Sequence, residues 1–190
     1  GATERLKRIV KPFILRRLKA DVLKELPAKM ESILDAPLEG EQKKLYEANL
    51  SLIRESMRST PDMSRVVVLS MLTKLRQICC DPSLVYPDYT GNSAKTDACM
   101  ELIETAVEGG HKILLFSQFT SMLDVIRRKL MEKGISHYVL KGDTPKSERL
   151  RLVSKFNEND VKVFLISLKA GGTGINLTGA DVVIHYDPWW

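Results

Sequence analysis

The sequence predicts a three-layer α/β fold with a parallel sheet, preceded by a helical segment, and two patterns lead to this prediction. From residue 95 onward, apolar runs of about five residues alternate with helical patterns, which is typical of a parallel sheet covered by helices on both faces. Upstream of residue 86, apolar residues recur mainly at helical spacing. The stretch 86–93 between these parts is rich in Pro, Asp, Gly, Asn and Ser, so it is a loop and the best internal boundary.

The first part of the chain is predicted to be mainly helical. Its elements are, in order, a helix at 5–24, an extended piece at 32–36, and helices at 41–57 and 64–79. Pro12 interrupts the first helix, and Leu26 ends it because the ring of Pro27 disfavours helix in the residue before it. Asp81-Pro82 ends the last helix.

The second part is predicted to alternate helix and strand. Helices are expected at 95–108, 121–133 and 145–157, and strands at 112–116, 137–140, 161–167 and 182–186. Ser121 is expected to cap the second of these helices, with Asp124 completing a capping arrangement. Thr144 is expected to cap the third, with Pro145 at its first position.

The net charge of +5 is unevenly distributed. Residues 1–30 hold nine Lys or Arg against three Asp or Glu, a net +6, whereas the other 160 residues hold 20 against 21, a net −1. A basic arm on a nearly neutral body indicates contact with a polyanion, although a solvated amphipathic helix explains the charge equally well.

Composition argues against several classes of protein. No run of about 18 apolar residues occurs and the basic N-terminus lacks a secretory apolar stretch, so a soluble, intracellular chain without membrane contact is expected. Cys79, Cys80 and Cys99 form neither an even disulfide framework nor a zinc-ligand spacing. Reduced thiols and no metal site are therefore predicted.

Four loops follow the carboxyl ends of the predicted strands, where ligands of such sheets bind. The most informative is the stretch 167–177, which has three glycines in four positions directly after a strand and lets backbone amides approach a phosphate. A structural tight turn is the alternative. No complete G-x-G-x-x-G or G-x-x-x-x-G-K-[ST] occurs, so no primary triphosphate-binding loop is predicted.

These loops carry a specific resemblance. The ordered segments are KILLFSQF, YVLKGDTPKSER, FLISLKAGGTGINLTGAD and VVIHYDPWW, with FILRRLKADVLKELPAK and LRQICCDPSL upstream. Together they resemble the C-terminal RecA-like (P-loop NTPase-type) lobe of the Swi/Snf family, which comprises superfamily-two helicase-like, DNA-dependent ATPases. Asp81 replaces a histidine common in that family. The resemblance implies an inter-lobe linker or brace at 1–35, a helical segment packing on the lobe at 36–93, and the helicase lobe at 94–190.

The resemblance also implies roles for particular residues. This lobe is expected to hold one strand of double-stranded DNA by its backbone, because small polar groups and a lysine contact phosphate without reading sequence. The implied DNA-binding residues are Ser117, Gln118, Gly142, Ser167, Lys169 and Trp190. The implied ATP-cleft residues are Gly172, Gly174 and Asp181, although Asp181 could equally be a turn or cap residue.

In this family ATP and Mg²⁺ are bound mainly by the first RecA-like lobe, the expected partner of this one. The family's arginine fingers, which stabilise the phosphoryl-transfer transition state, follow the sequence that ends here at Trp190. No catalytic residue and no ATP hydrolysis are therefore expected of this polypeptide alone.

Two rival functions remain open. One is a strand-separating DNA or RNA helicase of the same superfamily, which an unwinding assay set beside triplex displacement would distinguish. The other is a non-catalytic interaction module that uses the basic arm and the helices at 41–79. The expected location is cytoplasmic and nucleoid-associated in a bacterium, or nuclear in a eukaryote.

Overall fold

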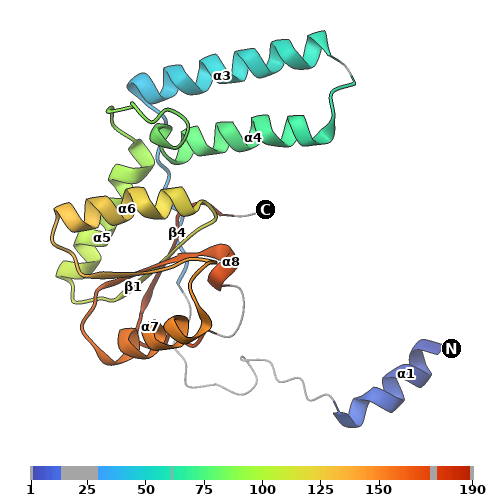
Figure 1. The fold of residues 1–190 in the computed structure, drawn as a ribbon, viewed down its shortest axis with the longest axis vertical. Helices are drawn as coiled ribbons and strands as arrows, with labels where there is room; N and C mark the ends of the chain where they lie inside the picture. The colour runs from blue at the N-terminus through green and yellow to red at the C-terminus, as the bar shows by residue number, and fades with distance from the viewer. Residues whose placement is uncertain (1, 14–29, 61, 172–174, 189–190) are drawn as a thin grey trace. The chain divides into compact units, whose positions relative to one another are not determined.

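The basic N-terminal part forms a unit of its own in the computed structural model, which describes residues 2–13, 30–60, 62–171 and 175–188. The chain divides into two compact units, Gly1–Asp35 and Ala36–Trp190. The first unit contains α1 (Ala2–Val10) and the 3-10 helix η1 (Lys11–Phe13), so the α-helix stops just before Pro12 (Figure 1). The rest of the helix predicted at 5–24 lies outside the described residues. The apolar side chains of Leu6, Ile9 and Phe13 are exposed, so the described part of this unit has no apolar core.

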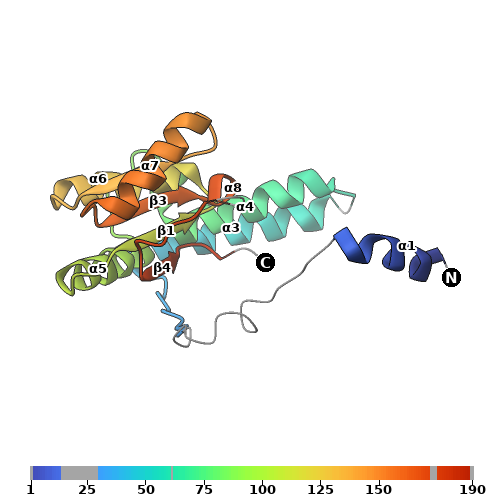
Figure 2. The same cartoon turned by 90° about the horizontal axis from the view of Figure 1, so that it is seen from below.

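The second unit begins with a helical hairpin, α3 (Gly40–Ser59) and α4 (Arg65–Cys80). The two helices lie side by side in both ribbon views (Figures 1 and 2). The Ser64 hydroxyl accepts a hydrogen bond from Val67 N and caps α4. α4 ends at Asp81-Pro82, where the short 3-10 helix η2 (Pro82–Leu84) follows, as predicted from the proline.

A four-stranded sheet forms the centre of the second unit. Its strands are β1 (Ile113–Ser117), β2 (His137–Leu140), β3 (Val163–Ser167) and β4 (Val182–His185). Their order is β2-β3-β1-β4, and all three pairings are parallel. The all-parallel α/β sheet is confirmed, and each predicted strand occurs within two residues of its predicted bounds.

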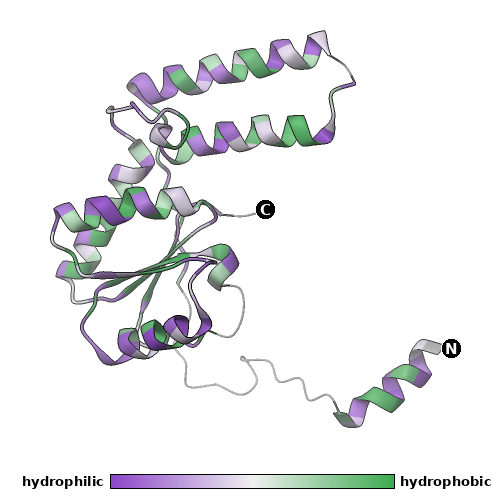
Figure 3. Cartoon of the chain, in the orientation of Figure 1, coloured by the Kyte–Doolittle hydropathy of each residue, from purple (hydrophilic) through white to green (hydrophobic). Residues whose placement is uncertain are grey.

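Helices cover both faces of this sheet (Figure 2). Ile113 and Leu115 pack with α5 (Ala94–Glu108) and α6 (Thr120–Glu132) on one face. Leu114 packs with α7 (Lys146–Glu158) and α8 (Leu168–Gly171) on the other. Successive residues of a strand point to opposite faces, so a strand covered on both sides must be apolar throughout. Figure 3 shows apolar colour along the strands.

The two predicted helix caps are wrong. α6 begins at Thr120 without a side-chain cap, and Asp124 pairs with Lys141 Nζ at 2.7 Å instead of closing a capping arrangement with Ser121. α7 begins at Lys146, and the Thr144 hydroxyl accepts from Lys141 N at 3.1 Å. Asp124 pairs with a lysine of the turn after β2, and the Thr144 hydroxyl closes that same turn on Lys141 N, so neither side chain caps a helix.

A buried polar network joins the hairpin to the sheet. The Tyr186 hydroxyl, directly after β4, donates to Cys80 O at 2.7 Å and lies 3.0 Å from the Thr96 hydroxyl. Thr96 also donates to the Asp81 carboxylate at 2.9 Å. The Gln42 side chain donates to Ile78 O and accepts from Ala94 N. Because these groups are satisfied by one another, the end of α4 is fixed on α5 and β4 without unpaired polar atoms.

Candidate nucleic-acid interface

The carboxyl ends of the parallel strands bring most of the candidate DNA-binding residues to one edge of the sheet. Ser117 and Ser167 end β1 and β3 and lie opposite each other in the ladder. Gln118 follows Ser117, and Lys169 lies on α8, which starts directly after Ser167. Gly142 follows β2, the neighbour of β3. Trp190 lies outside the described residues.

The two serines are buried and use their hydroxyls within the chain. The Ser117 hydroxyl accepts from Phe119 N at 3.1 Å, and the Ser167 hydroxyl accepts from Ala170 N at 3.3 Å. Each hydroxyl therefore holds the first turn of the loop that follows its strand. A small polar side chain is needed at both positions, because a larger one could not be buried there and still bond the next turn.

Of the candidate residues at this edge that the structure describes, Gly142 and Lys169 are exposed. A Cβ atom built on Gly142 would meet nothing within 4 Å, so the backbone there is open to a ligand. Lys169 makes no ion pair with any residue in the described ranges. This edge therefore combines an accessible backbone segment with an accessible positive charge, a combination that suits phosphate.

The glycine-rich stretch is anchored on α7. Arg149 Nη1 donates to Ala170 O at 2.8 Å. The Asn157 side chain donates to Asn176 O and accepts from Gly179 N, both at 3.0 Å. The stretch opens as a helical turn, α8, and is tied down on either side of Gly172 and Gly174, which themselves lie outside the described residues.

Asp187 is a residue of this edge that the sequence analysis did not assign. It follows β4, is 4% exposed, and accepts a hydrogen bond from Gln118 N, which lies 3.1 Å from each carboxylate oxygen. Burial raises its pKa, opposed by hydrogen bonds from Ser117 and Gln118 and by the charge of Lys95. The nearby Gln118 side chain also lowers the pKa of Asp187. The Gln118 Nε2 atom is buried, and no acceptor among the described residues lies at hydrogen-bonding geometry to it. The only sequence signal was an aspartate directly after a strand.

Asp181 lies at the opposite end of the sheet. Its carboxylate pairs with His111 Nδ1 at 2.5 Å and accepts from Lys112 N at 3.0 Å, just before β1 and β4 begin. The hydrogen bond from His111 and that from Lys112 lower the pKa of Asp181. The structure thus places Asp181 with the amino ends of the strands, away from the other candidate residues.

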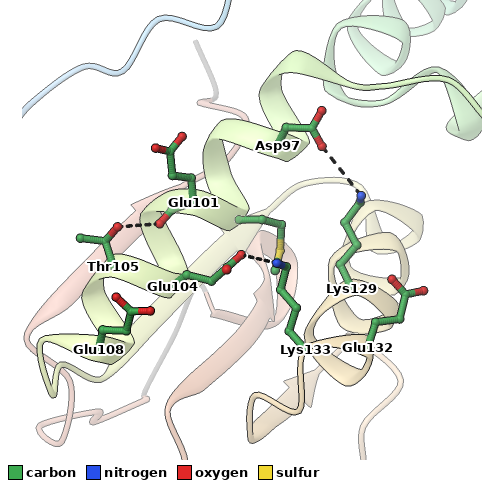
Figure 4. A pocket seen from close by; sticks show the side chains of 9 residues that line it. Asp97, Glu101, Glu104, Thr105, Glu108, Lys129, Glu132 and Lys133 are labelled. Carbon is green, nitrogen blue, oxygen red and sulfur yellow. Dashed lines mark hydrogen bonds and ion pairs between the residues drawn. The ribbon is translucent and has the colours of Figure 1, made fainter.

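An acidic groove of about 530 Å³ separates α5 from α6, away from this edge (Figure 4). Two ion pairs cross it, Lys129–Asp97 at 3.8 Å and Lys133–Glu104 at 2.8 Å. Its other charged lining residues are Glu101, Glu108 and Glu132. Five carboxylates against two lysines make this groove unsuitable for a phosphate.

The part of the chain that the structure describes holds no metal site and no membrane span. No three His, Cys, Asp or Glu side chains come together there as a metal would require, and no helix there is long and apolar enough to cross a bilayer. All three cysteines are free, and burial raises the pKa of Cys80 and of Cys99 to about 12. These two thiols therefore stay protonated at neutral pH.

Two domain families match the chain. Residues 94–190 match the helicase conserved C-terminal domain, and residues 1–84 match the SNF2-related domain. An uncharacterized ATP-dependent helicase of Mycoplasma pneumoniae is 41% identical over 94% of this chain and 17% of its own length. The SWI/SNF-related matrix-associated actin-dependent regulator of chromatin subfamily A member 1 of Mus musculus is 38% identical over 98% of this chain and 19% of its own length. The chain thus spans about a fifth of these curated relatives.

Two solved structures of proteins from Sulfolobus solfataricus have the same fold as this chain. The SWI2/SNF2 ATPase core in complex with double-stranded DNA is 35% identical, covers 98% of this chain and 41% of its own, and has a TM-score of 0.77. The SWI2/SNF2 ATPase C-terminal domain is 38% identical, covers 79% of this chain and 68% of its own, and has a TM-score of 0.70.

Proposed function

The chain belongs to the SNF2-related family of helicases, whose conserved C-terminal domain it carries, and from this membership we propose that it is the second RecA-like lobe of an ATP-dependent double-stranded-DNA translocase. One observation carries the proposal. The carboxyl-end edge exposes a backbone segment at Gly142 and a positive charge at Lys169, in a chain of which 98% is covered by the match to an ATPase core in complex with double-stranded DNA.

In this proposal the edge grips one DNA strand by its phosphates. Lys169 supplies the charge, and the backbone near Gly142 supplies hydrogen-bond donors. Gln118 contributes through its side chain, because its amide already bonds Asp187. The buried hydroxyls of Ser117 and Ser167 shape the two loops from below. Trp190 stacks against a sugar or base. Contacts of this kind carry no sequence information, which suits movement along any duplex.

We propose that ATP is bound mainly by the partner lobe. Gly172 and Gly174 face the nucleotide cleft when the two lobes close, while ATP and Mg²⁺ are held mainly by the first lobe. The described residues of this chain do not fit a metal ion, so no step is assigned to one here. The carboxylate of Asp181 already bonds His111 and Lys112. Its proposed role in the ATP cleft is therefore supported by the resemblance to the family alone. Closing on ATP and reopening after hydrolysis would alternate the grip on DNA.

A charge reversal at Lys169 tests the grip. The variant Lys169→Glu of this chain is expected to bind a fluorescent duplex several-fold more weakly and to lower the slope of log affinity against log salt by about 1, because one phosphate contact is lost. The matched control is Lys155→Glu, an exposed position near the carboxyl end of α7, beside the amino ends of the strands. If both variants weakened duplex binding equally, the loss would reflect overall charge, and the proposed contact between Lys169 and a phosphate would be contradicted.

The purified chain is expected to release no phosphate from ATP, with or without duplex DNA. No carboxylate set for Mg²⁺ occurs in the described part, and the catalytic groups are proposed to lie outside this lobe. A malachite-green assay checks this. DNA-stimulated release by the wild-type chain would contradict the division of labour between two lobes.

A further inference from the structure

A single buried carboxylate links the ends of β1 and β4 beneath the proposed DNA-contacting loop. Asp187 follows β4, and Gln118 follows β1, the strand that pairs with it. Gln118 N lies 3.1 Å from both oxygens of the Asp187 carboxylate, and the nearby Ser117 side chain also lowers the pKa of this group. We infer that Asp187 is a positioning residue, whose carboxylate fixes the backbone of residues 117–119 in the shape that meets the DNA backbone. This inference rests on the proposed function.

The cost of placing a carboxylate here argues for a specific task. Asp187 is 4% exposed, and burial of an ionisable group is unfavourable unless hydrogen bonds compensate for lost water. The Gln118 amide provides that compensation at one point of one loop, and the nearby Ser117 side chain also lowers the pKa of the carboxylate. Lys95 faces the carboxylate from α5 and reduces its negative potential. The carboxylate is therefore placed to hold the loop while it stays hidden from an approaching phosphate.

The loop has a second anchor on its other side. Arg76, on α4 of the hairpin, lies with its guanidinium 5.9 Å from the Phe119 ring and donates to Pro188 O at 3.5 Å. Phe119 directly follows Gln118, and Pro188 directly follows Asp187, so Arg76 contacts both neighbours of the hydrogen-bonded pair. The backbone is thus held by the carboxylate from within and by the hairpin from outside, while Gln118 Nε2 keeps a donor that no described acceptor uses.

Three variants of this chain test the inference. Asp187→Ala removes both acceptors, and Asp187→Asn keeps one oxygen at nearly the same size. Asp81→Asn is the matched control, because Asp81 is also buried at 6% exposed but bonds Ser83 and Thr96 in the hairpin joint. Duplex affinity is measured at a temperature where each variant is folded. Amide hydrogen exchange at residues 118 and 119 is followed in the same samples without DNA.

The dissociation constant for duplex DNA is expected to rise about tenfold in Asp187→Ala and less in Asp187→Asn, since a hydrogen bond to a charged group is lost or weakened. Exchange at Gln118 N should accelerate in the same order. Asp81→Asn should lower stability but change neither readout.

Two results would overturn the inference. One is unchanged exchange at Gln118 in both Asp187 variants, and the other is an equal loss of affinity in Asp81→Asn. Should the wild-type chain itself fail to bind duplex DNA with a steep salt dependence, the proposed function fails instead. The exchange rates alone would then decide whether Asp187 positions this loop.

Discussion

Two glycines of the carboxyl-end loops meet opposite surroundings. A Cβ atom on Gly171 would lie 2.8 Å from Phe116 Cε1 and 3.1 Å from Ile166 Cγ2, which are side chains of β1 and β3. A Cβ atom on Gly142 would meet nothing within 4 Å, and neither glycine has a positive φ. Gly171 is therefore required for close packing of α8 on the sheet, whereas Gly142 leaves a surface open.

Alanine substitutions distinguish these two cases. Gly171→Ala is expected to destabilise the chain by about 1–3 kcal/mol, because the ring of Phe116 must move within a packed site. Gly142→Ala should change the free energy of unfolding by less than about 0.5 kcal/mol. Urea denaturation followed by circular dichroism measures both. A neutral Gly171→Ala would show that α8 can shift away from β1 without cost.

At the scale of elements, the hairpin is held by directed polar contacts in addition to the buried apolar side chains of α4, such as Leu75 and Ile78. Buried hydrogen bonds connect α3, α4, α5 and the end of β4. They are made by the side chains of Gln42, Asp81, Thr96 and Tyr186. The far end of the hairpin leaves several apolar side chains exposed: Leu52, Met57, Val66, Leu69 and Leu72. Apolar burial is non-directional, whereas hydrogen bonds have fixed lengths and angles, so the network specifies how α4 leaves the lobe.

Removing one hydroxyl tests this joint. Tyr186→Phe is expected to lower the free energy of unfolding by about 1–2 kcal/mol, because Cys80 O and Thr96 lose a buried partner. The control is Tyr138→Phe, whose hydroxyl bonds Asn159 at an exposed site and should contribute much less. Equal losses in thermal or urea unfolding would contradict a specific role for the joint.

At the scale of the whole molecule, charge and packing are divided between the two units. The first 30 residues carry a net +6, while the rest of the chain is close to neutral. The described apolar side chains of the first unit are exposed except for the half-buried Val10, and an isolated helix as short as α1 is marginal in water. The sheet, its helices and the hairpin all belong to the unit Ala36–Trp190. Removal of the first unit is therefore expected to weaken the attraction of the chain to DNA while leaving its folding stability nearly unchanged.

A chain of residues 36–190 tests this separation. Its melting temperature is expected to stay within about 2 °C of the full chain, because the described part of the first unit contributes no buried core. Its duplex affinity should fall, with a shallower salt dependence, because nine basic residues are lost. Differential scanning calorimetry and fluorescence anisotropy measure the two quantities. A large drop in melting temperature would show that the arm packs on the lobe.

The sequence by itself determined the sheet, its helices and the edge that carries the candidate site. Apolar period and breaker residues are local signals, so β1 to β4 and α3 to α7 were predicted near their observed bounds. The parallel order placed Ser117, Ser167 and Lys169 at one edge, because carboxyl ends of parallel strands meet there.

Only the tertiary structure decided which partner each polar group finds. Asp124 pairs with Lys141 after β2 instead of capping α6, and Asp181 joins His111 at the amino end of the sheet. Asp187 reaches Gln118 across 69 residues of chain. A short polar side chain bonds whichever group the fold brings within about 3 Å, and that distance depends on the packing of whole elements rather than on neighbours in sequence.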